Sequence, residues 1–148
     1  MLEPTSDLFD LIEVREILEA EAVKLAAARR TRQHLEALER QLQQDAEKAA
    51  RAAYAVDDDV RFHRLLFEAA GNKVLLRFVH LIRTVTRSFY ELQLMTAEKQ
   101  AQTLQEHTAI YEAVRDRKRV KAVAALRTHI RTTADEILAD ANARSAPA

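Results

Sequence analysis

The sequence predicts an all-α fold, with about six helices packed as an antiparallel bundle. Only one glycine and two prolines occur among the 148 residues, and the prolines stand at positions 4 and 147. The body of the chain therefore contains almost nothing that breaks a helix or makes a hairpin turn. Apolar residues form 48% of the chain and recur at helical spacing. The length suits one domain with its own core.

The first predicted helix begins at Ser6, its expected N-cap, and ends near Arg30. Its apolar stripe consists of Leu8, Leu11, Ile12, Leu18, Ala22 and Leu25. Arg15 interrupts this stripe. An arginine in such a place either reaches the rim or pairs with an acid, or it lines a cavity and binds an anion.

The second predicted helix begins after the cap Thr31 and ends near Lys48. Its narrow stripe, which indicates packing on one side only, consists of Leu35, Leu38 and Leu42. The alanine-rich residues 49–55 fit either a loop or a continuous helix. The three acids at 57–59 favour the N-terminus of a third helix, where the dipole stabilises negative charge. The Gly-Asn pair at 71–72 favours its end.

The fourth predicted helix, from about Lys73 to Leu94, carries two faces. The wide apolar face consists of Leu75, Phe78, Val79, Ile82, Val85 and Phe89. The mixed face consists of Leu76, His80, Arg83, Arg87 and Tyr90. Two faces predict two neighbours, the bundle on one side and either a partner subunit or a ligand cavity on the other. Arg83 and Arg87 are then either partners in surface ion pairs or ligand-binding groups.

Two further helices complete the predicted bundle. Thr96 is the expected cap of the fifth helix. A charged turn at 116–118 leads to the sixth helix, which is expected to end near Ala139. Residues 142–148 are expected to fray.

Three of the five histidines lie within apolar stripes, so they are expected to point into the core. They are His63 on the third helix, His107 on the fifth and His129 on the sixth. The ordinary role of one inward histidine is a core residue that is hydrogen-bonded to a neighbour. His34, near a helix start, and His80, on the mixed face, are expected to be structural or solvated.

An acid next to these histidines makes a metal site the alternative. Asp59 lies four residues before His63, so both side chains lie on the same side of a helix and can bind one ion. His107 and His129 would complete a set of one carboxylate and three imidazoles. This set suits a divalent metal ion, zinc first, with nickel or manganese as alternatives. The sequence thus predicts a central metal or ligand cavity in the bundle.

Composition excludes several classes of protein. The chain has no cysteine, which rules out disulfides and cysteine-zinc sites. No apolar run is long enough to span a bilayer and the start lacks the build of a signal peptide, so we expect a soluble, cytoplasmic protein without membrane contact. Basic and acidic residues balance at 23 each. Without a basic stripe or a marked recognition helix, these residues are not expected to bind DNA alone.

Four segments occur in an order typical of a known family: EVREILEAEAVKLAA, DVRFHRLLFEAAGN, EHTAIYEAV and ALRTHI. Over about residues 8–138 the chain resembles the C-terminal effector-binding and dimerisation domain, the FCD domain, of FadR-type regulators in the GntR superfamily of bacterial transcription regulators. The resemblance implies an antiparallel bundle of six or seven helices. It also implies metal ligation by Asp59, His63, His107 and His129.

The resemblance further implies a homodimer that senses a small carboxylate effector. The metal would hold the acid, and Arg15, Arg83 and Arg87 are the candidate effector-binding residues. Such regulators read DNA through an N-terminal winged helix-turn-helix. That domain is expected to be absent from this chain, because the first helix begins within the first ten residues. Transcription would then be regulated through a winged-helix domain outside these residues, and no catalytic residue is expected.

Two other functions fit the same donor set. A metal with an open coordination position lowers the pKa of bound water, which would suit a metal-dependent hydrolase or lyase. Glu106, beside His107, is the one candidate base for such an enzyme. In the other alternative, the metal only staples three helices of a dimerisation module.

Overall fold

The structure, a computed structural model, describes residues 6–90 and 95–145. Within these residues the chain forms helices and no strand, and the predicted all-α class is confirmed. The six helices are α1 (Ser6–Arg29), α2 (Arg32–Ala49), α3 (Val56–Glu68), α4 (Lys73–Tyr90), α5 (Ala97–Arg115) and α6 (Arg119–Ser145). None of the helices in the described part has both the length and the apolar character needed to cross a bilayer.

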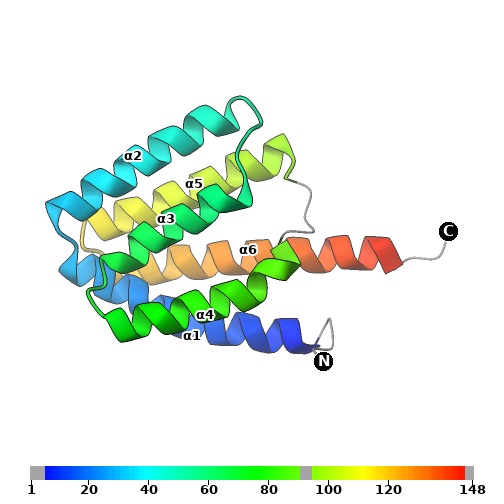
Figure 1. Ribbon diagram of the computed structural model, residues 1–148, viewed down its shortest axis with the longest axis horizontal. Coiled ribbons are helices and arrows are strands. Elements are labelled where there is room, and N and C mark those ends of the chain that lie inside the picture. Colours follow the sequence, from blue (N-terminus) through cyan, green and yellow to red (C-terminus); the bar gives the residue numbers. More distant parts are fainter. Residues whose placement is uncertain (1–5, 91–94, 146–148) are drawn as a thin grey trace.

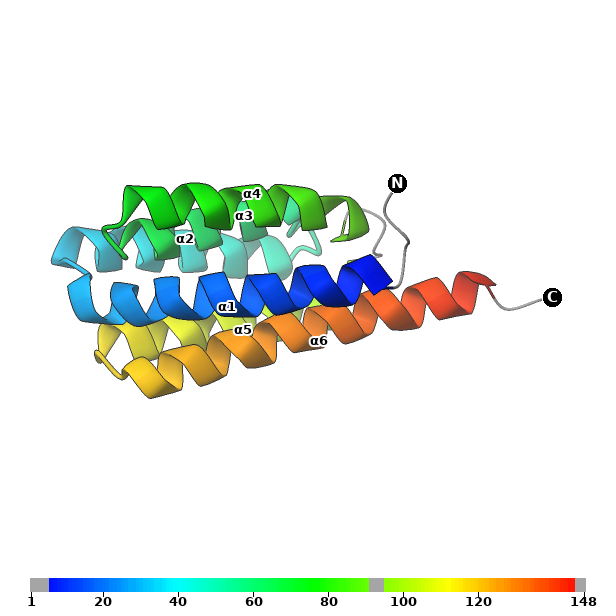
Figure 2. The same ribbon diagram turned by 90° about the horizontal axis from the view of Figure 1, so that it is seen from below.

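Successive helices run in opposite directions, as the sequence colours show (Figure 1). Helix α1 packs against both α4 and α6, and these three form one side of the bundle (Figure 2). Helix α2 packs against α3 and α5 on the other side. Helix α3 therefore contacts α1, α2 and α4, which gives its residues access to the middle of the molecule.

The core is built mostly from leucine, isoleucine, phenylalanine and small residues of all six helices. Its fully buried large side chains include Leu38, Phe62, Leu66, Phe67, Val79, Ile110, Leu126 and Ile130. Alanines on α1, among them Ala26 and Ala27, are also completely buried. Small residues let neighbouring helices approach α1 closely. Its central place in the bundle is consistent with this composition.

Most of the predicted helix boundaries are confirmed. The hydroxyl oxygens of Thr31 and Thr96 accept hydrogen bonds from the backbone N–H groups three residues later, as N-caps do. The carboxylate of Asp58 caps α3 by accepting from the N–H of Ala55 at 3.0 Å. Gly71 has a φ of 65°, the left-handed conformation expected after a helix. Asn72 then caps α4, because its side-chain oxygen accepts from the backbone of Val74 and Leu75.

Two ambiguous or incorrect boundaries are resolved by the structure. Helix α2 ends at Ala49, and the following residues form a turn in which Ala52 has a φ of 53°, so the alanine-rich segment is a loop. Helix α6 continues to Ser145, beyond the predicted end near Ala139 and through part of the segment expected to fray. The predicted cap role of the Ser6 side chain, the predicted last turn at 91–94 and the tail at 146–148 fall outside what the structure describes.

The face of α4 that packs against the bundle differs from the prediction. Phe78 and Val85 were expected on the core face, but they are 55% and 36% exposed. Val79, also predicted on that face, is buried as expected, and Thr86, which was not, is buried beside it. Arg83 of the predicted mixed face also turns inward, where it forms ion pairs with acids of α1 and α3.

Candidate metal centre

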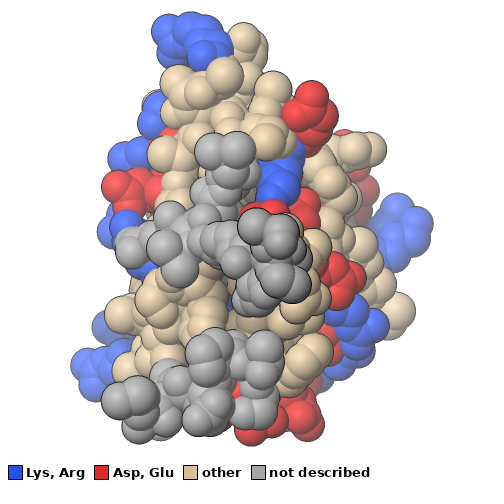
Figure 3. Space-filling model, turned by 90° about the vertical axis from the view of Figure 1, so that its right-hand side faces the viewer, with Lys and Arg blue, Asp and Glu red and all other residues tan. Residues whose placement is uncertain are grey.

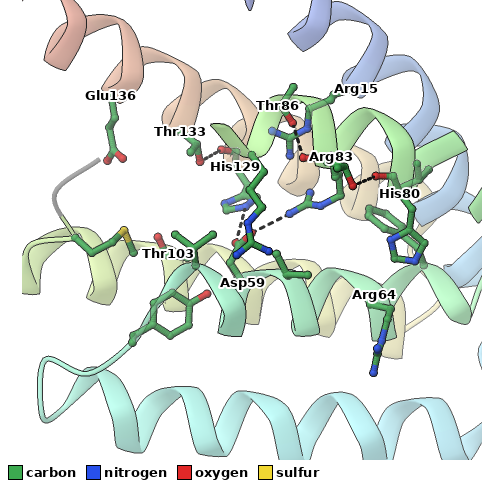
Figure 4. A pocket seen from close by; sticks show the side chains of 18 residues that line it. Arg15, Asp59, Arg64, His80, Arg83, Thr86, Thr103, His129, Thr133 and Glu136 are labelled. Carbon is green, nitrogen blue, oxygen red and sulfur yellow. Dashed lines mark hydrogen bonds and ion pairs between the residues drawn. The ribbon is translucent and has the colours of Figure 1, made fainter. Parts of the chain in front are cut away.

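Four side chains from three helices meet at one point inside the bundle. Asp59 and His63 come from α3, His107 from α5 and His129 from α6, and one donor atom of each lies within 4.8 Å of all the others. The three histidines are almost completely buried, as predicted, while Asp59 is partly exposed. Figure 4 shows Asp59 and His129 next to each other in the middle of the pocket wall.

The distances between the donor atoms fit one shared ion. His129 Nε2 lies 3.2 Å from His63 Nε2 and 3.4 Å from His107 Nε2. Asp59 Oδ1 lies 3.2 Å from His107 Nε2, 3.5 Å from His63 Nε2 and 3.9 Å from His129 Nε2. Nitrogen and oxygen ligands bound at about 2.0–2.2 Å from zinc lie roughly 3 to 3.5 Å apart in ordinary coordination geometries. Most of the observed distances fall in this range.

The protonation states also suit metal binding. Burial lowers the pKa of His107 to about 4, and burial together with the charge of Arg83 holds the pKa of His63 well below its usual value. Both imidazoles are therefore neutral near pH 7, which is the form that binds a metal. Burial opposes ionisation of Asp59, but the imidazoles and Arg83 hold the pKa of its carboxyl well below its usual value. The carboxylate is therefore ionised.

The three imidazoles are oriented in different ways. His129 Nδ1 is 2.6 Å from Glu106 Oε2, a carboxylate partner of the kind that orients metal-binding histidines. The Nδ1 atoms of His63 and His107 are buried, and neither has a hydrogen-bond partner in the described part of the chain. Aromatic packing orients these two rings instead. Phe62 stacks on His107 with ring centroids 4.0 Å apart, and Phe67 stacks on His63 at 5.8 Å.

Two of the three candidate effector arginines belong to an ion-pair network beside the donor cluster. Arg83 donates to Asp59 Oδ2 at 2.8 Å and to both carboxylate oxygens of Glu19 at 3.1 and 3.2 Å. Arg15, which is 2% exposed, donates from Nε to Glu19 Oε1 at 2.9 Å. Of the two roles considered for Arg15, pairing with an internal acid is therefore present. Arg15 also lines the pocket, so the anion-binding role stays open.

The third candidate, Arg87, lies farther from the donors. Its guanidinium pairs with Asp57 at 2.8 Å, and both side chains are exposed by 40% or more. It still contributes to the pocket wall. Of the two remaining histidines, His80 is exposed, whereas His34 completes a capping box by accepting from the backbone N–H of Thr31. The prediction that both lie outside the donor cluster is confirmed.

A pocket of about 110 Å³ opens onto the donor cluster. Asp59 and His129 lie in its wall, together with Arg15 and Arg83, and it extends between α3, α4, α5 and α6. His63 and His107 lie behind this wall. An ion held by the cluster would therefore present one side to the pocket.

Sequence reasoning missed several residues of this site, Glu19 and Tyr54 among them. Glu19 is completely buried between Arg15 and Arg83, and although burial opposes ionisation, the two arginines hold the pKa of its carboxyl at about 2. The signal for it was its position four residues after Arg15, where the two side chains meet on one helix face. Tyr54, in the loop before α3, also lines the pocket. No pattern in the sequence points to this tyrosine, because it lies in a short loop.

Comparison with protein families finds a match to the FCD domain over residues 10–132. Among curated proteins, the chain is 29% identical over 143 residues to the HTH-type transcriptional regulator LutR of Bacillus subtilis. It is 32% identical over 105 residues to the galactonate operon transcriptional repressor of Escherichia coli. These matches cover 93% and 70% of this chain but only 65% and 45% of the relatives. The chain thus spans less than two thirds of their length.

Solved structures show the same bundle. Escherichia coli McbR/YncC superposes with a TM-score of 0.80 at 13% identity, over 92% of this chain and 66% of that one. A GntR protein of Streptococcus agalactiae superposes with a TM-score of 0.71 at 24% identity, over 91% of this chain and 62% of that one. At these identities the likeness concerns the fold.

Proposed function

The chain belongs to the FCD family, the FCD domain of GntR-type transcriptional regulators, and we propose that it senses a small organic acid through a bound divalent metal. It is a regulatory domain rather than an enzyme, since the curated relatives are transcriptional regulators. The hydrolase or lyase alternative is therefore set aside. Glu106, the candidate base of that alternative, is instead the partner of His129.

The observation that carries the proposal is the convergence of four donor atoms beside a pocket. Asp59, His63, His107 and His129 would hold the ion, with zinc first and nickel or manganese as alternatives. A bound divalent ion supplies positive charge and Lewis acidity at an open coordination position. The protein residues orient the donors and shape the pocket for the acid.

The charges around the site give the metal a second role. Asp59 brings one negative charge to the donor set, and imidazoles bind a metal in their neutral form. A divalent ion held there would keep about one net positive charge, which matches a single carboxylate. Without the ion this charge is missing, so acid binding should require the metal.

The arginines would complete the acid site from α1 and α4. Both guanidinium groups already pair with Glu19, which fixes them in the pocket wall without neutralising them fully. Charge-assisted hydrogen bonds from such fixed groups favour a carboxylate over a neutral ligand. The alternative of a metal that only staples three helices predicts no acid binding.

Calorimetric titration of simple carboxylic acids into metal-loaded and metal-stripped protein tests the proposal. We expect binding only to the metal-loaded form, accompanied by a higher midpoint of thermal unfolding. Arg15→Met should weaken the binding by about 1.5–3 kcal/mol, the range for a charge-assisted hydrogen bond. Arg131→Met is the control, because Arg131 pairs with Glu16 at the surface and lies outside the pocket. Equal acid binding with and without metal would refute the charge argument.

We also propose that the domain forms a homodimer through an apolar stripe on two adjacent helices. The stripe consists of Phe9, Val14 and Ile17 of α1 and Val74, Phe78, Leu81 and Val85 of α4, all at least 36% exposed. Helices α1 and α4 pack against each other, so the two sets form one surface. In sedimentation, Phe78→Glu should convert a dimer to a monomer. Val120→Glu should not, because Val120 is 84% exposed on α6, outside the stripe.

DNA binding is proposed to reside in a winged-helix domain attached to such a sensing domain. The end of the bundle seen in Figure 3 shows positive and negative side chains interspersed, without a field of one sign. This agrees with the equal numbers of basic and acidic residues. A symmetric dimer would place two DNA-reading domains at a fixed spacing, and acid binding would change that spacing.

A further inference from the structure

The pocket has two chemically different ends. Arg83 and Arg15 lie on one side of Asp59 and His129, and Thr103, Thr133 and Glu136 lie on the other (Figure 4). The first end carries two guanidinium groups. The second is formed by α5, α6 and the loop before α3, and it presents hydroxyl groups and one carboxylate.

Tyr54 brings a buried phenol to the second end. Its backbone N–H donates to Gln100 Oε1 at 3.2 Å, which places the residue beside the start of α5, one turn before Thr103. The residue is 3% exposed and lines the pocket, and its hydroxyl has no hydrogen-bond partner among residues 6–90 and 95–145. A buried hydroxyl without a partner destabilises a folded protein. Packing alone would be served as well or better by phenylalanine, so the hydroxyl calls for a ligand.

The surroundings of Tyr54 make it a hydrogen-bond donor. Burial raises the pKa of its phenol, and the negative charge of nearby Asp59 raises it further. The hydroxyl therefore keeps its proton at any physiological pH. It can donate to an oxygen of a bound molecule and accept a hydrogen bond in return.

Glu136 limits what the second end can accept. Its carboxylate is half-buried in the pocket wall, on α6 two turns beyond His129. A second carboxylate on the ligand would meet this like charge in a poorly solvated place, which is unfavourable. A ligand hydroxyl would instead donate to it.

We propose that Tyr54 is a specificity-determining residue, which donates to a hydroxyl or carbonyl oxygen that the effector carries beyond its metal-bound carboxylate. Together with Glu136 it makes the pocket selective for hydroxylated monocarboxylates over unsubstituted acids and over dicarboxylates. The inference rests on the proposed acid sensing, and it adds the chemical class of the acid.

The test uses matched acids on the metal-loaded protein. A six-carbon set compares galactonate with hexanoate, which lacks the hydroxyls, and with galactarate, which carries a second carboxylate. A three-carbon set compares glycerate with propionate and tartronate in the same way. In calorimetry, the hydroxylated monocarboxylate of at least one set should bind about tenfold or more tightly than its two partners, the range for a well-made hydrogen bond and for avoided charge repulsion.

Tyr54→Phe then isolates the hydroxyl. It should weaken the binding of the hydroxylated monocarboxylate about tenfold and leave the binding of the unsubstituted acid unchanged. The ligand-free variant should be as stable as the wild type or more stable, since it loses only an unpartnered group. Tyr111→Phe is the matched control, because the Tyr111 hydroxyl bonds to Glu39 on α2, away from the pocket. It should lose stability and keep acid binding.

The outcomes separate this inference from the proposed function. If no acid of either set binds the metal-loaded wild type at millimolar concentration, the sensor proposal is refuted, and the role of Tyr54 with it. If acids bind but show no preference for hydroxyls, or if Tyr54→Phe weakens both members of a pair equally, only the role of Tyr54 is refuted.

Discussion

Asp58 and Asp59 are neighbours in the first turn of α3, and they belong to two different polar clusters. Asp59 belongs to the donor cluster between α3, α5 and α6. Asp58 belongs to a second cluster between α2 and α3, which we name the α2 cluster. Its members are Gln41, Asp45, Lys48, Asp58 and Arg61.

Both clusters contain buried atoms without a hydrogen-bond partner among the described residues, Asp45 Oδ2 in the α2 cluster included, but their central groups differ in their partners. Asp58 accepts from Lys48 Nζ at 2.5 Å, from Arg61 at 2.6 Å and from the backbone N–H of Ala55. In the donor cluster, three imidazole Nε2 atoms face one another, and two of the rings have no partner at Nδ1. Asp58 links two helices through partners from the chain itself. In the donor cluster, several donor atoms converge on one point, which is the arrangement expected of a ligand site.

The largest expected effect is the loss of bound metal when a histidine of the donor cluster is replaced. His63→Ala and His129→Ala should each reduce bound zinc from about one equivalent per chain to near zero. Each variant is compared with and without metal, so that the stability lost through the cavity left by the substitution cancels. For the wild type, metal at several hundred times its dissociation constant should raise the unfolding free energy by about 3–4 kcal/mol. In the variants this increase should disappear. Elemental analysis and denaturant unfolding measure both quantities.

His34→Ala is the control for this experiment. His34 lies in the capping box of α2, so the variant should lose about 1 kcal/mol or less and keep its metal. Wild-type protein that holds far less than one equivalent after reconstitution would overturn the metal site itself.

The second prediction separates the roles of the two neighbouring acids, Asp58 and Asp59. Asp58→Ala removes the cap of α3 and a shared partner of Lys48 and Arg61, and it should cost about 2 kcal/mol in unfolding free energy while metal stays bound. Asp59→Ala should weaken metal binding by at least tenfold, the effect typical of removing a partner from a metal site. If Asp58→Ala also released the metal, the two clusters would not be independent.

The smallest expected effect is a difference in pH dependence between the clusters. Burial raises the pKa of Asp45 to about 6, so the folded protein binds a proton that the unfolded chain, with an ordinary carboxyl pKa, releases. Acidification from about pH 6 to 4 should therefore stabilise the α2 cluster. The donor cluster should respond in the opposite direction in the metal-free protein. Burial lowers the pKa of His107 to about 4, so protons favour the unfolded chain below about pH 6.5.

Asp45→Asn tests this opposition. Asparagine keeps an oxygen for the 2.7 Å hydrogen bond from Gln41 and removes the buried charge, so it should stabilise the protein by about 1 kcal/mol near pH 7. Near pH 4 the gain should vanish, because Asp45 is already protonated there. Denaturant unfolding of metal-free protein at the two pH values decides it. A gain of the same size at both would show that Asp45 does not titrate as described.

The sequence allowed the helices and the donor set to be predicted for local reasons. Thr31, Thr96 and Gly71 mark helix ends by chemistry that acts within a few residues, and the structure confirms them. Asp59 and His63 share a helix, so their spacing alone brings them together. The histidines on the other two helices followed from apolar stripes, which correctly indicated that they point inward.

What the sequence did not predict depends on contacts between distant residues. Arg83 faces inward on α4, and its partners Glu19 and Asp59 are 64 and 24 residues away. The apolar pattern alone favoured a face that includes Phe78, because a helical pattern does not distinguish core from an exposed apolar stripe. Tyr54 is a pocket residue only because its loop lies against the start of α5.

The separation of the donors along the chain also has a kinetic consequence. His63 and His129 are 66 residues apart, and only Asp59 and His63 lie on the same helix. The complete site therefore exists only when α3, α5 and α6 have docked. A metal that binds only this docked bundle should slow unfolding and leave the folding rate almost unchanged. Its supply would then determine how long the native state lasts, and not how quickly it is reached.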